Sequence, residues 1–250
     1  MTTLETTTVG PVTTLTLSGL GRRNPLTPAL LSAIVSACDD LRTRDDVRVV
    51  VLRGAGGFFS GGADLMSFMA AFQTTDRTTV ADLGRRAGEA LASLPQITVA
   101  FVEGHCVGGG VVLAAACDLR WAAEGAWFSI PELDIGMPLT WGALPRLVQL
   151  LGESRALDLV LSCRRFDARE AHAMGFVATE LSGDVAATFE ERLAALASLP
   201  KNALRTTKAQ TLAIRAGTFD AASDADALLK ALADPETAAQ AQAYMQRRKR

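Results

Sequence analysis

The chain has 250 residues, of which 49% are hydrophobic and 21% are charged, and its formal net charge is −2. This length and composition are typical of a globular protein with a sizeable core, built as one large domain or as a domain with a short extension. The small net charge gives no electrostatic reason to expect nucleic acid or an anionic membrane as a partner. No apolar run approaches the roughly 18 residues of a membrane span, and the first ten residues lack the basic and apolar regions of a signal peptide.

The four cysteines are scattered along the chain and form no C-x-x-C pair. Metal sites and disulfide frameworks usually show such pairs or regular spacings. We therefore expect no metal site, reduced thiols and a cytoplasmic location.

The first part of the chain alternates between strand-like and helix-like patterns. Residues 6–9 and 12–17 alternate in polarity around a Gly-Pro pair, which predicts a β-hairpin. Apolar residues then recur at helical spacing over 28–43, after a threonine that can cap the helix and a proline at its first position. The nearly continuous apolar run 47–52 predicts a strand of a sheet that is covered on both faces.

The same order of strand, loop and helix is predicted again further along the chain. A helix is expected over 79–94, a strand over 97–102, and a glycine-started helix that includes 111–116. Short strands are expected at 119–122 and 127–130. The repetition predicts a layered α/β architecture.

After Gly152 the chain is expected to be helical throughout. Predicted helices cover residues 154–162, 167–174, 185–199, 203–216 and 221–232. A soft boundary falls near Leu199 and Pro200, beyond which no strand is expected. The predicted organisation is an α/β domain over residues 1–199 and a helical region over residues 200–250.

Two glycine-rich loops each follow a predicted strand. The first contains F-F-S-G-G-A-D-L at residues 58–65, and it matches neither a P-loop nor a dinucleotide fingerprint. Ser60 fails the G-x-S-x-G pattern of a serine nucleophile, and His105 and His172 lack an obvious orienting acid. The second loop contains Gly108, Gly109 and Gly110 directly before an apolar helix. Free N–H groups at such a helix start suit a developing oxyanion or a phosphate, and close helix–strand packing is the alternative.

Five motifs together resemble the crotonase, or enoyl-CoA hydratase/isomerase, superfamily over nearly the whole chain. They are F-S-G-G-A-D-L (59–65), G-H-C-V-G-G-G-V-V-L-A-A-A-C-D-L (104–119), N-P-L (24–26), I-P-E-L (130–133) and G-A-L-P-R-L (142–147). The resemblance implies a spiral of repeated ββα units with a C-terminal helical region that drives trimerisation, often into a dimer of trimers.

The resemblance also implies an acyl-CoA thioester as ligand, with no cofactor other than the coenzyme A of the substrate. The backbone N–H groups of Ala63 and Gly109 match the oxyanion donors. Either Arg22 or Arg23 is expected to meet the CoA phosphates, whereas Lys208 and Lys249 are expected to be exposed. The further positions that match substrate contacts are Leu26, Asp64, Leu65, Met66, Gly108, Val112, Pro131, Thr140 and Trp141.

The reaction depends on which carboxylates are present. Hydratases of the family use two glutamates, but the first of those positions is Val112 here, and only the second, Glu132, is retained. Dienoyl-CoA isomerases and aryl-CoA dehalogenases of the family place an aspartate where this chain has Thr140. Asp134 is the acid that most competes with Glu132, while His105, Glu103 and Asp118 are expected to be structural.

Three interpretations follow. The first is a one-base enoyl-CoA isomerase in which Glu132 moves a proton from C2 to C4 of a 3-enoyl-CoA. The second is a hydratase or related lyase in which water or another residue replaces the missing glutamate. The third is an acyl-CoA binding protein that has lost catalysis, which would be stabilised by ligand but would turn nothing over.

Overall fold

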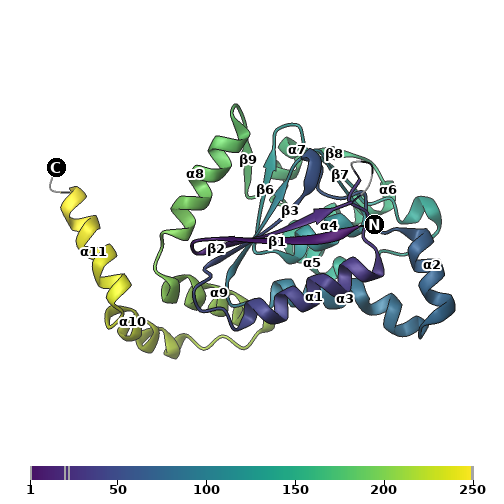
Figure 1. The fold of residues 1–250 in the computed structure, drawn as a ribbon. Coiled ribbons are helices and arrows are strands. Elements are labelled where there is room, and N and C mark those ends of the chain that lie inside the picture. Colours follow the sequence, from purple (N-terminus) through teal and green to yellow (C-terminus); the bar gives the residue numbers. More distant parts are fainter. Residues whose placement is uncertain (1, 20, 22, 249–250) are drawn as a thin grey trace.

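The computed structural model describes residues 2–19, 21 and 23–248 of the chain, and it shows a mixed α/β fold (Figure 1). In this part of the chain a six-stranded sheet has the order β1-β2-β3-β4-β6-β9 and is parallel except for the first pair. A smaller sheet has the order β5-β7-β8. The strands are β1 Thr3–Val9, β2 Val12–Ser18, β3 Val49–Gly54, β4 Ile97–Val102, β5 His105–Val107, β6 Leu119–Ala123, β7 Trp127–Ser129, β8 Phe166–Asp167 and β9 Thr179–Leu181.

Helices lie on both faces of the large sheet and continue beyond it. They are α1 Pro28–Arg42, α2 Leu65–Thr74, α3 Arg77–Ala92, α4 Gly109–Ala116, α5 Ala143–Leu151, α6 Glu153–Ser162, α7 Ala168–Ala173, α8 Val185–Ala197, α9 Lys201–Ala216, α10 Asp224–Leu232 and α11 Pro235–Arg248. None of the described helices is long and apolar enough to cross a bilayer.

The continuous apolar pattern of β3 arises because helices cover both of its faces. Val50 and Leu52 point into the larger core, which α1, α3 and α4 complete. Val49 and Val51 point into a second core that α8 closes, where the rings of Phe101 and Phe189 stack with centroids 4.0 Å apart. Successive strand residues point to opposite faces, so a strand between two helical layers is apolar at every position.

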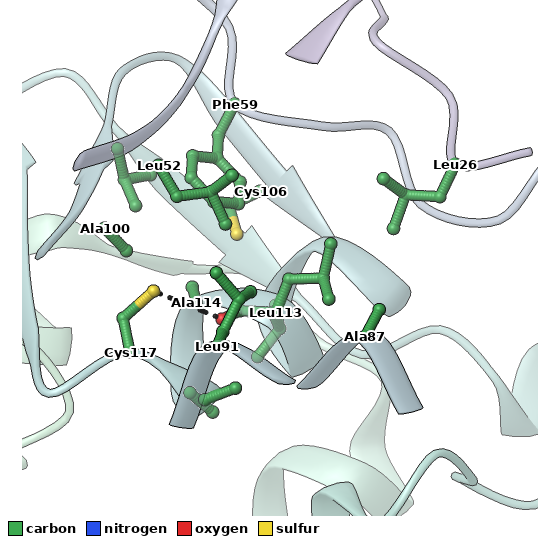
Figure 2. Packing of buried hydrophobic residues seen from close by; sticks show 14 of the residues in the cluster. Leu26, Leu52, Phe59, Ala87, Leu91, Ala100, Cys106, Leu113, Ala114 and Cys117 are labelled. Carbon is green, nitrogen blue, oxygen red and sulfur yellow. Dashed lines mark hydrogen bonds between the residues drawn. The ribbon is translucent and has the colours of Figure 1, made fainter. Parts of the chain in front are cut away.

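The larger core brings the two glycine-rich loops to one place. Figure 2 shows Leu113 of α4 packed near Ala87 and Leu91 of α3, with Cys106 of β5 close by. Small residues on α3 and α4 let the two helices approach, since a Cβ on Gly88 would lie 3.6 Å from the Cβ of Ala116. This packing fixes the start of α4, which is the glycine run.

Several predicted elements are confirmed. The strand 97–102 is found with its predicted ends, and the hairpin and the helix from Pro28 are found within three residues of theirs. Thr27 caps α1 as expected, because its Oγ1 accepts the amide of Leu30 at 3.1 Å.

Other expectations were wrong or incomplete. The chain is not helical throughout after Gly152: β8 and β9 each add a short edge strand, and strands of two or three residues carry no alternation that a sequence pattern can reveal. Helices α2 and α5 were not predicted. The described cysteines are free thiols, three of them buried, and the described residues hold no group of three His, Cys, Asp or Glu side chains that could bind a metal.

Lys208 was expected to be exposed, and that expectation was wrong. Only 4% of this α9 residue is exposed, and its Nζ donates to the Gln96 carbonyl at 2.8 Å and pairs with Asp118 at 2.6 Å. Asp118 also accepts the amide and hydroxyl of Thr98 at 2.7 and 2.9 Å, in the structural role expected for it. This polar cluster links α9 to the residues that directly precede β4 and β6. Helices α10 and α11 extend away from the body (Figure 1).

Candidate active site

The two glycine-rich loops meet edge to edge. Ser60 and Cys106 form an isolated parallel bridge, and the Val107 amide donates to the Ser60 carbonyl at 2.9 Å. Gly62 has φ +91°, and a Cβ on it would lie 2.9 Å from the Val107 carbonyl oxygen. Glycine is therefore required there by both the backbone conformation and the contact.

The chain before α1 orients the amide of Ala63. Leu26 donates its amide to Gly62 O at 2.8 Å and accepts the Asp64 amide at 2.9 Å, so both of its bonds go to the neighbours of Ala63. In a parallel bridge of this kind the central residue directs its own N–H to the opposite side. For Ala63 that side is the cavity.

The second amide comes from the helix start. Gly109 is the first residue of α4, and the first amides of a helix have no acceptor within the helix. Within residues 2–19, 21 and 23–248, neither the Ala63 nor the Gly109 amide has a hydrogen-bond acceptor. Two unengaged N–H groups thus face one cavity, one of them at the positive end of a helix dipole.

The cavity has a volume of about 400 Å³ and is mainly apolar. Besides the residues of the two loops and Glu132, it is lined by Leu65, Phe68, Phe72, Ala81, Val112, Pro131, Ile135, Met137, Pro138, Leu139, Thr140 and Trp141. Among the described lining residues, Glu132, Thr140 and Trp141 are the ones whose side chains carry a nitrogen or oxygen atom. Such a lining suits a ligand that is itself mainly apolar.

Glu132 is the ionisable group of the cavity. Its Oε2 is buried and has no hydrogen-bond partner in the described part of the chain. Burial raises the pKa of its carboxyl above the usual value. A Cβ on Gly108 would lie 2.7 Å from Glu132 Oε1, so the carboxylate rests directly against the glycine run.

Trp141 closes the cavity beside the second amide. A Cβ on Gly109 would overlap its indole, which therefore lies in contact with the first turn of α4. The ring of Phe68 packs against it with centroids 5.8 Å apart. Val112 faces the same cavity, so the position of a second carboxylate in the family's hydratases is occupied here by an apolar side chain.

The structure brings most of the predicted site residues to this cavity. Ala63, Leu65, Gly108, Gly109, Val112, Pro131, Glu132, Thr140 and Trp141 all line it. Asp64 instead caps α2, accepting the Ser67 amide at 3.1 Å, and Met66 points outward with 80% of its surface exposed. Arg23 is exposed and does not line the cavity, and Arg22 and Lys249 lie outside the described residues.

Leu26 was predicted to touch substrate, but its side chain is fully buried. It packs beneath Gly109, 3.1 Å from the position of a Cβ there, so Leu26 supports the site from behind through its packing and its two backbone bonds. Sequence spacing does not distinguish a residue that lines a cavity from one that packs behind the lining.

His105 packs as expected rather than lining the cavity. Its ring lies 4.7 Å from Phe58 and 5.8 Å from Trp127, centroid to centroid. Burial, aided by the charge of Arg23, lowers its pKa. Glu103 is likewise structural, since it pairs with Arg53 at 2.7 Å.

Sequence reasoning missed Gly84, Ala81 and the three apolar residues Ile135, Met137 and Leu139. One signal was present, because an isolated glycine within a helical pattern often has a packing reason. Gly84 lies in α3, and a Cβ on it would overlap the Trp141 indole.

A cavity that brings two backbone amides and one carboxylate together in apolar surroundings can stabilise a developing oxyanion. The family model described as enoyl-CoA hydratase/isomerase matches residues 8–249. The chain therefore belongs to the enoyl-CoA hydratase/isomerase family, as the motifs predicted.

Individual relatives differ in the reaction that their names state. A probable enoyl-CoA hydratase of Bacillus subtilis is 34% identical over 62% of this chain and 60% of its own length. A peroxisomal Δ(3,5)-Δ(2,4)-dienoyl-CoA isomerase of Arabidopsis thaliana is 35% identical over 56% of this chain and 55% of its own. These matches thus span about 60% or less of the relatives' lengths.

A solved structure shares the fold over most of the chain. It is a putative enoyl-CoA hydratase from Thermobifida fusca in complex with acetoacetyl-CoA, with a TM-score of 0.82 and 28% identity. The match covers 92% of this chain and 94% of that one. The predicted crotonase-like fold is therefore confirmed.

Proposed function

We propose that this protein is an enoyl-CoA isomerase that converts a 3-enoyl-CoA to the conjugated 2-enoyl-CoA. The observation that carries the proposal is the half-buried carboxylate of Glu132, whose buried Oε2 has no partner among the described residues, in the cavity that Ala63 and Gly109 also line. The apolar side chain of Val112 occupies the other position at which a carboxylate would be needed for hydration.

The two amides supply the electrostatic part of the mechanism. Removing a proton from C2 of a thioester places negative charge on its carbonyl oxygen. Two fixed N–H donors in an apolar cavity stabilise that charge without reorganising, and each such donor contributes roughly 3–4 kcal/mol in comparable sites. Backbone donors leave the side chain free, so small residues can occupy both positions.

Glu132 supplies the proton transfer. Its ionised carboxylate takes a proton from C2, the electron pair delocalises over C2, C3, C4 and the thioester oxygen, and the carboxyl returns the proton to C4. No atom is gained or lost. The raised pKa of the carboxyl makes it a stronger base than an exposed glutamate and brings its pKa nearer to neutral pH, where general base catalysis is most effective.

Hydration of a 2-enoyl-CoA is the second candidate, because the Bacillus relative is named a hydratase. Water addition requires a group that activates the water and a group that supplies the α-proton. Asp134, the other acid near Glu132, is exposed and does not line the cavity. The isomerase therefore agrees better with the one acid that the cavity holds.

The proposal also covers the cofactor, the contacts with CoA and the oligomeric state. Coenzyme A arrives with the substrate, and no separate cofactor is required. Leu65 lines the cavity, and we propose that Arg23, which is exposed, binds the CoA phosphates. We further propose a homotrimer or a dimer of trimers, because α10 presents exposed leucines that a partner would cover.

The test is to add the purified protein to a 3-enoyl-CoA and to follow the ultraviolet absorbance. The conjugated product absorbs at wavelengths where the substrate does not. We expect wild-type protein and D134N to form the 2-enoyl thioester, and E132Q to lose at least 100-fold in kcat. Asp134 is the matched control because it is a neighbouring acid outside the cavity. Formation of a 3-hydroxyacyl-CoA from 2-enoyl-CoA would instead establish the hydratase, and ligand-induced stabilisation without turnover would establish a non-catalytic binder.

A further inference from the structure

Trp141 adopts a backbone conformation that tryptophan rarely takes. Its φ is +57°, and the next residue, Gly142, has φ +68°. A bulky residue with positive φ is unfavourable and persists where its surroundings hold it in place. The reason to hold this side chain lies in the cavity that it closes.

The Trp141 indole packs against two glycines, Gly84 of α3 and Gly109 of α4, which together are called its seat. A Cβ on Gly84 of α3 or on Gly109 of α4 would overlap the Trp141 ring. Glycine in the middle of a helix is unfavourable relative to alanine, and Gly84 is buried eight residues into α3. The indole therefore occupies the space that a side chain at position 84 would need.

The seat lies where the cavity stops. Ala81 lines the cavity, whereas Gly84, one turn further along α3, is covered by the indole and does not line it. Residues three apart on a helix lie on one face. The space along this face of α3 is therefore open at Ala81 and filled by Trp141 at Gly84.

The same indole is close to the reacting end of the ligand. It contacts Gly109, whose amide is one of the two free donors, while Glu132 rests against Gly108. A thioester oxygen bound at the two donors would therefore lie near both the carboxylate and the indole. Trp141 is then the first side chain that limits how far an acyl chain extends along α3.

We propose that Trp141, seated on Gly84 and Gly109, sets the acyl-chain length of the ligand, and that the protein takes a short, apolar acyl-CoA. This inference rests on the acyl-CoA ligand of the proposed function but not on isomerisation. It assigns Gly84 a role as well, since a side chain at that position would displace the indole into the cavity.

The experiment measures the Kd of saturated acyl-CoAs, from acetyl-CoA to dodecanoyl-CoA, by calorimetry. Saturated chains cannot isomerise, so binding is measured without turnover. We expect wild-type affinity to fall at least tenfold from the best short chain to dodecanoyl-CoA, and W141A to recover at least tenfold for the long chains. G84A is expected to shift the limit to shorter chains, and the double variant W141A/G84A to behave like W141A.

The control is W127A, which removes an indole that does not line the cavity, and its chain-length profile should equal that of the wild type. W141L serves if W141A does not fold. A folded Trp141 variant that keeps the wild-type profile would overturn the inference alone. Failure of the wild type to bind any acyl-CoA would overturn both the inference and the proposed ligand. If the wild type shows no isomerase activity but the Trp141 variants change the chain-length profile, the inference is supported and only the proposed reaction is overturned.

Discussion

Glu132 shows how one residue couples the site to the stability of the fold. Its side chain is half-buried, its Oε2 is buried and has no partner in the described chain, and this burial raises the pKa of the carboxyl. The ionised form of a carboxyl that is poorly solvated in the folded state destabilises that state relative to the protonated form. The same burial that prepares the base for proton transfer therefore lowers the stability of the protein.

The pH dependence of stability follows from the sign of this pKa shift. Because the folded-state pKa is raised, the folded protein holds the Glu132 proton more tightly than the unfolded chain. The resulting stability is present in acid, below the unfolded pKa, and is lost as the pH rises through the folded pKa. We expect E132Q to melt at a higher temperature than the wild type at pH 7. Each kcal/mol gained in the free energy of unfolding should raise the melting temperature by about 2–4 °C.

The measurement is the difference in melting temperature between E132Q and wild type from pH 4 to pH 8. The difference should grow with pH and become small at the acidic end. D134N should show no such trend, because Asp134 is exposed. A difference that stays constant across the range would contradict the assignment of a raised pKa.

At the scale of elements, one lysine decides how α9 joins the sheet. Lys208 is buried, pairs with Asp118 and donates to the Gln96 carbonyl, while Asp118 also holds the end of β4 through Thr98. A buried ion pair with these additional bonds is about as stabilising as a pair of apolar side chains at the same two positions. Removing only one partner leaves the other charge without its ion pair, which lowers stability.

We expect K208M to lower the free energy of unfolding by about 3 kcal/mol, the lower end for a broken buried pair, because Asp118 keeps its Thr98 donors. The measurement is urea denaturation. K201M is the matched control on the same helix, since Lys201 pairs with the exposed Asp45 and such surface pairs contribute about 0–1 kcal/mol. Equal effects of the two variants would show that Lys208 does not anchor α9.

At the scale of the whole molecule, the C-terminal helices leave apolar surface uncovered. Leu228, Leu229 and Leu232 of α10 are each 60–64% exposed, and α10 and α11 extend from the body (Figure 1). A contiguous exposed apolar patch of this kind usually marks a contact with another protein. This exposed surface supports the proposed association of several copies of the chain.

We expect the triple variant L228Q/L229Q/L232Q, and likewise removal of residues 236–250, to shift the protein to a lower mass in sedimentation velocity. Each fully buried leucine contributes about 1.5–3 kcal/mol relative to an exposed one, so three replacements should weaken the assembly by several orders of magnitude in dissociation constant. K230Q, an exposed position on the same helix, should leave the profile unchanged. Unchanged sedimentation of the triple variant and the truncated chain would exclude α10 and α11 as the interface.

The sequence alone determined the elements with strong local signals and the family. Capping by Thr27, the two-faced apolar pattern of β3 and the glycine run before α4 depend on residues close together in the chain, so pattern reasoning located them. The motif spacing likewise identified Glu132 and Val112, because the family places both carboxylate positions at fixed distances from the glycines. Local chemistry was sufficient at these positions.

Only the tertiary structure decided what depends on contacts between distant segments. The short strands β8 and β9 form because an edge of an existing sheet offers them partners, and Lys208 is buried because Asp118 and Gln96 approach it from a different part of the chain. Leu26 lies behind the site and Trp141 lies inside it, although both matched the same family of contact positions. The pairing of Gly84 with Trp141, 57 residues later in the sequence, is visible only when α3 and the loop before α5 are packed together. Burial is a property of the packed chain, and residue spacing alone does not encode which neighbour will cover a side chain.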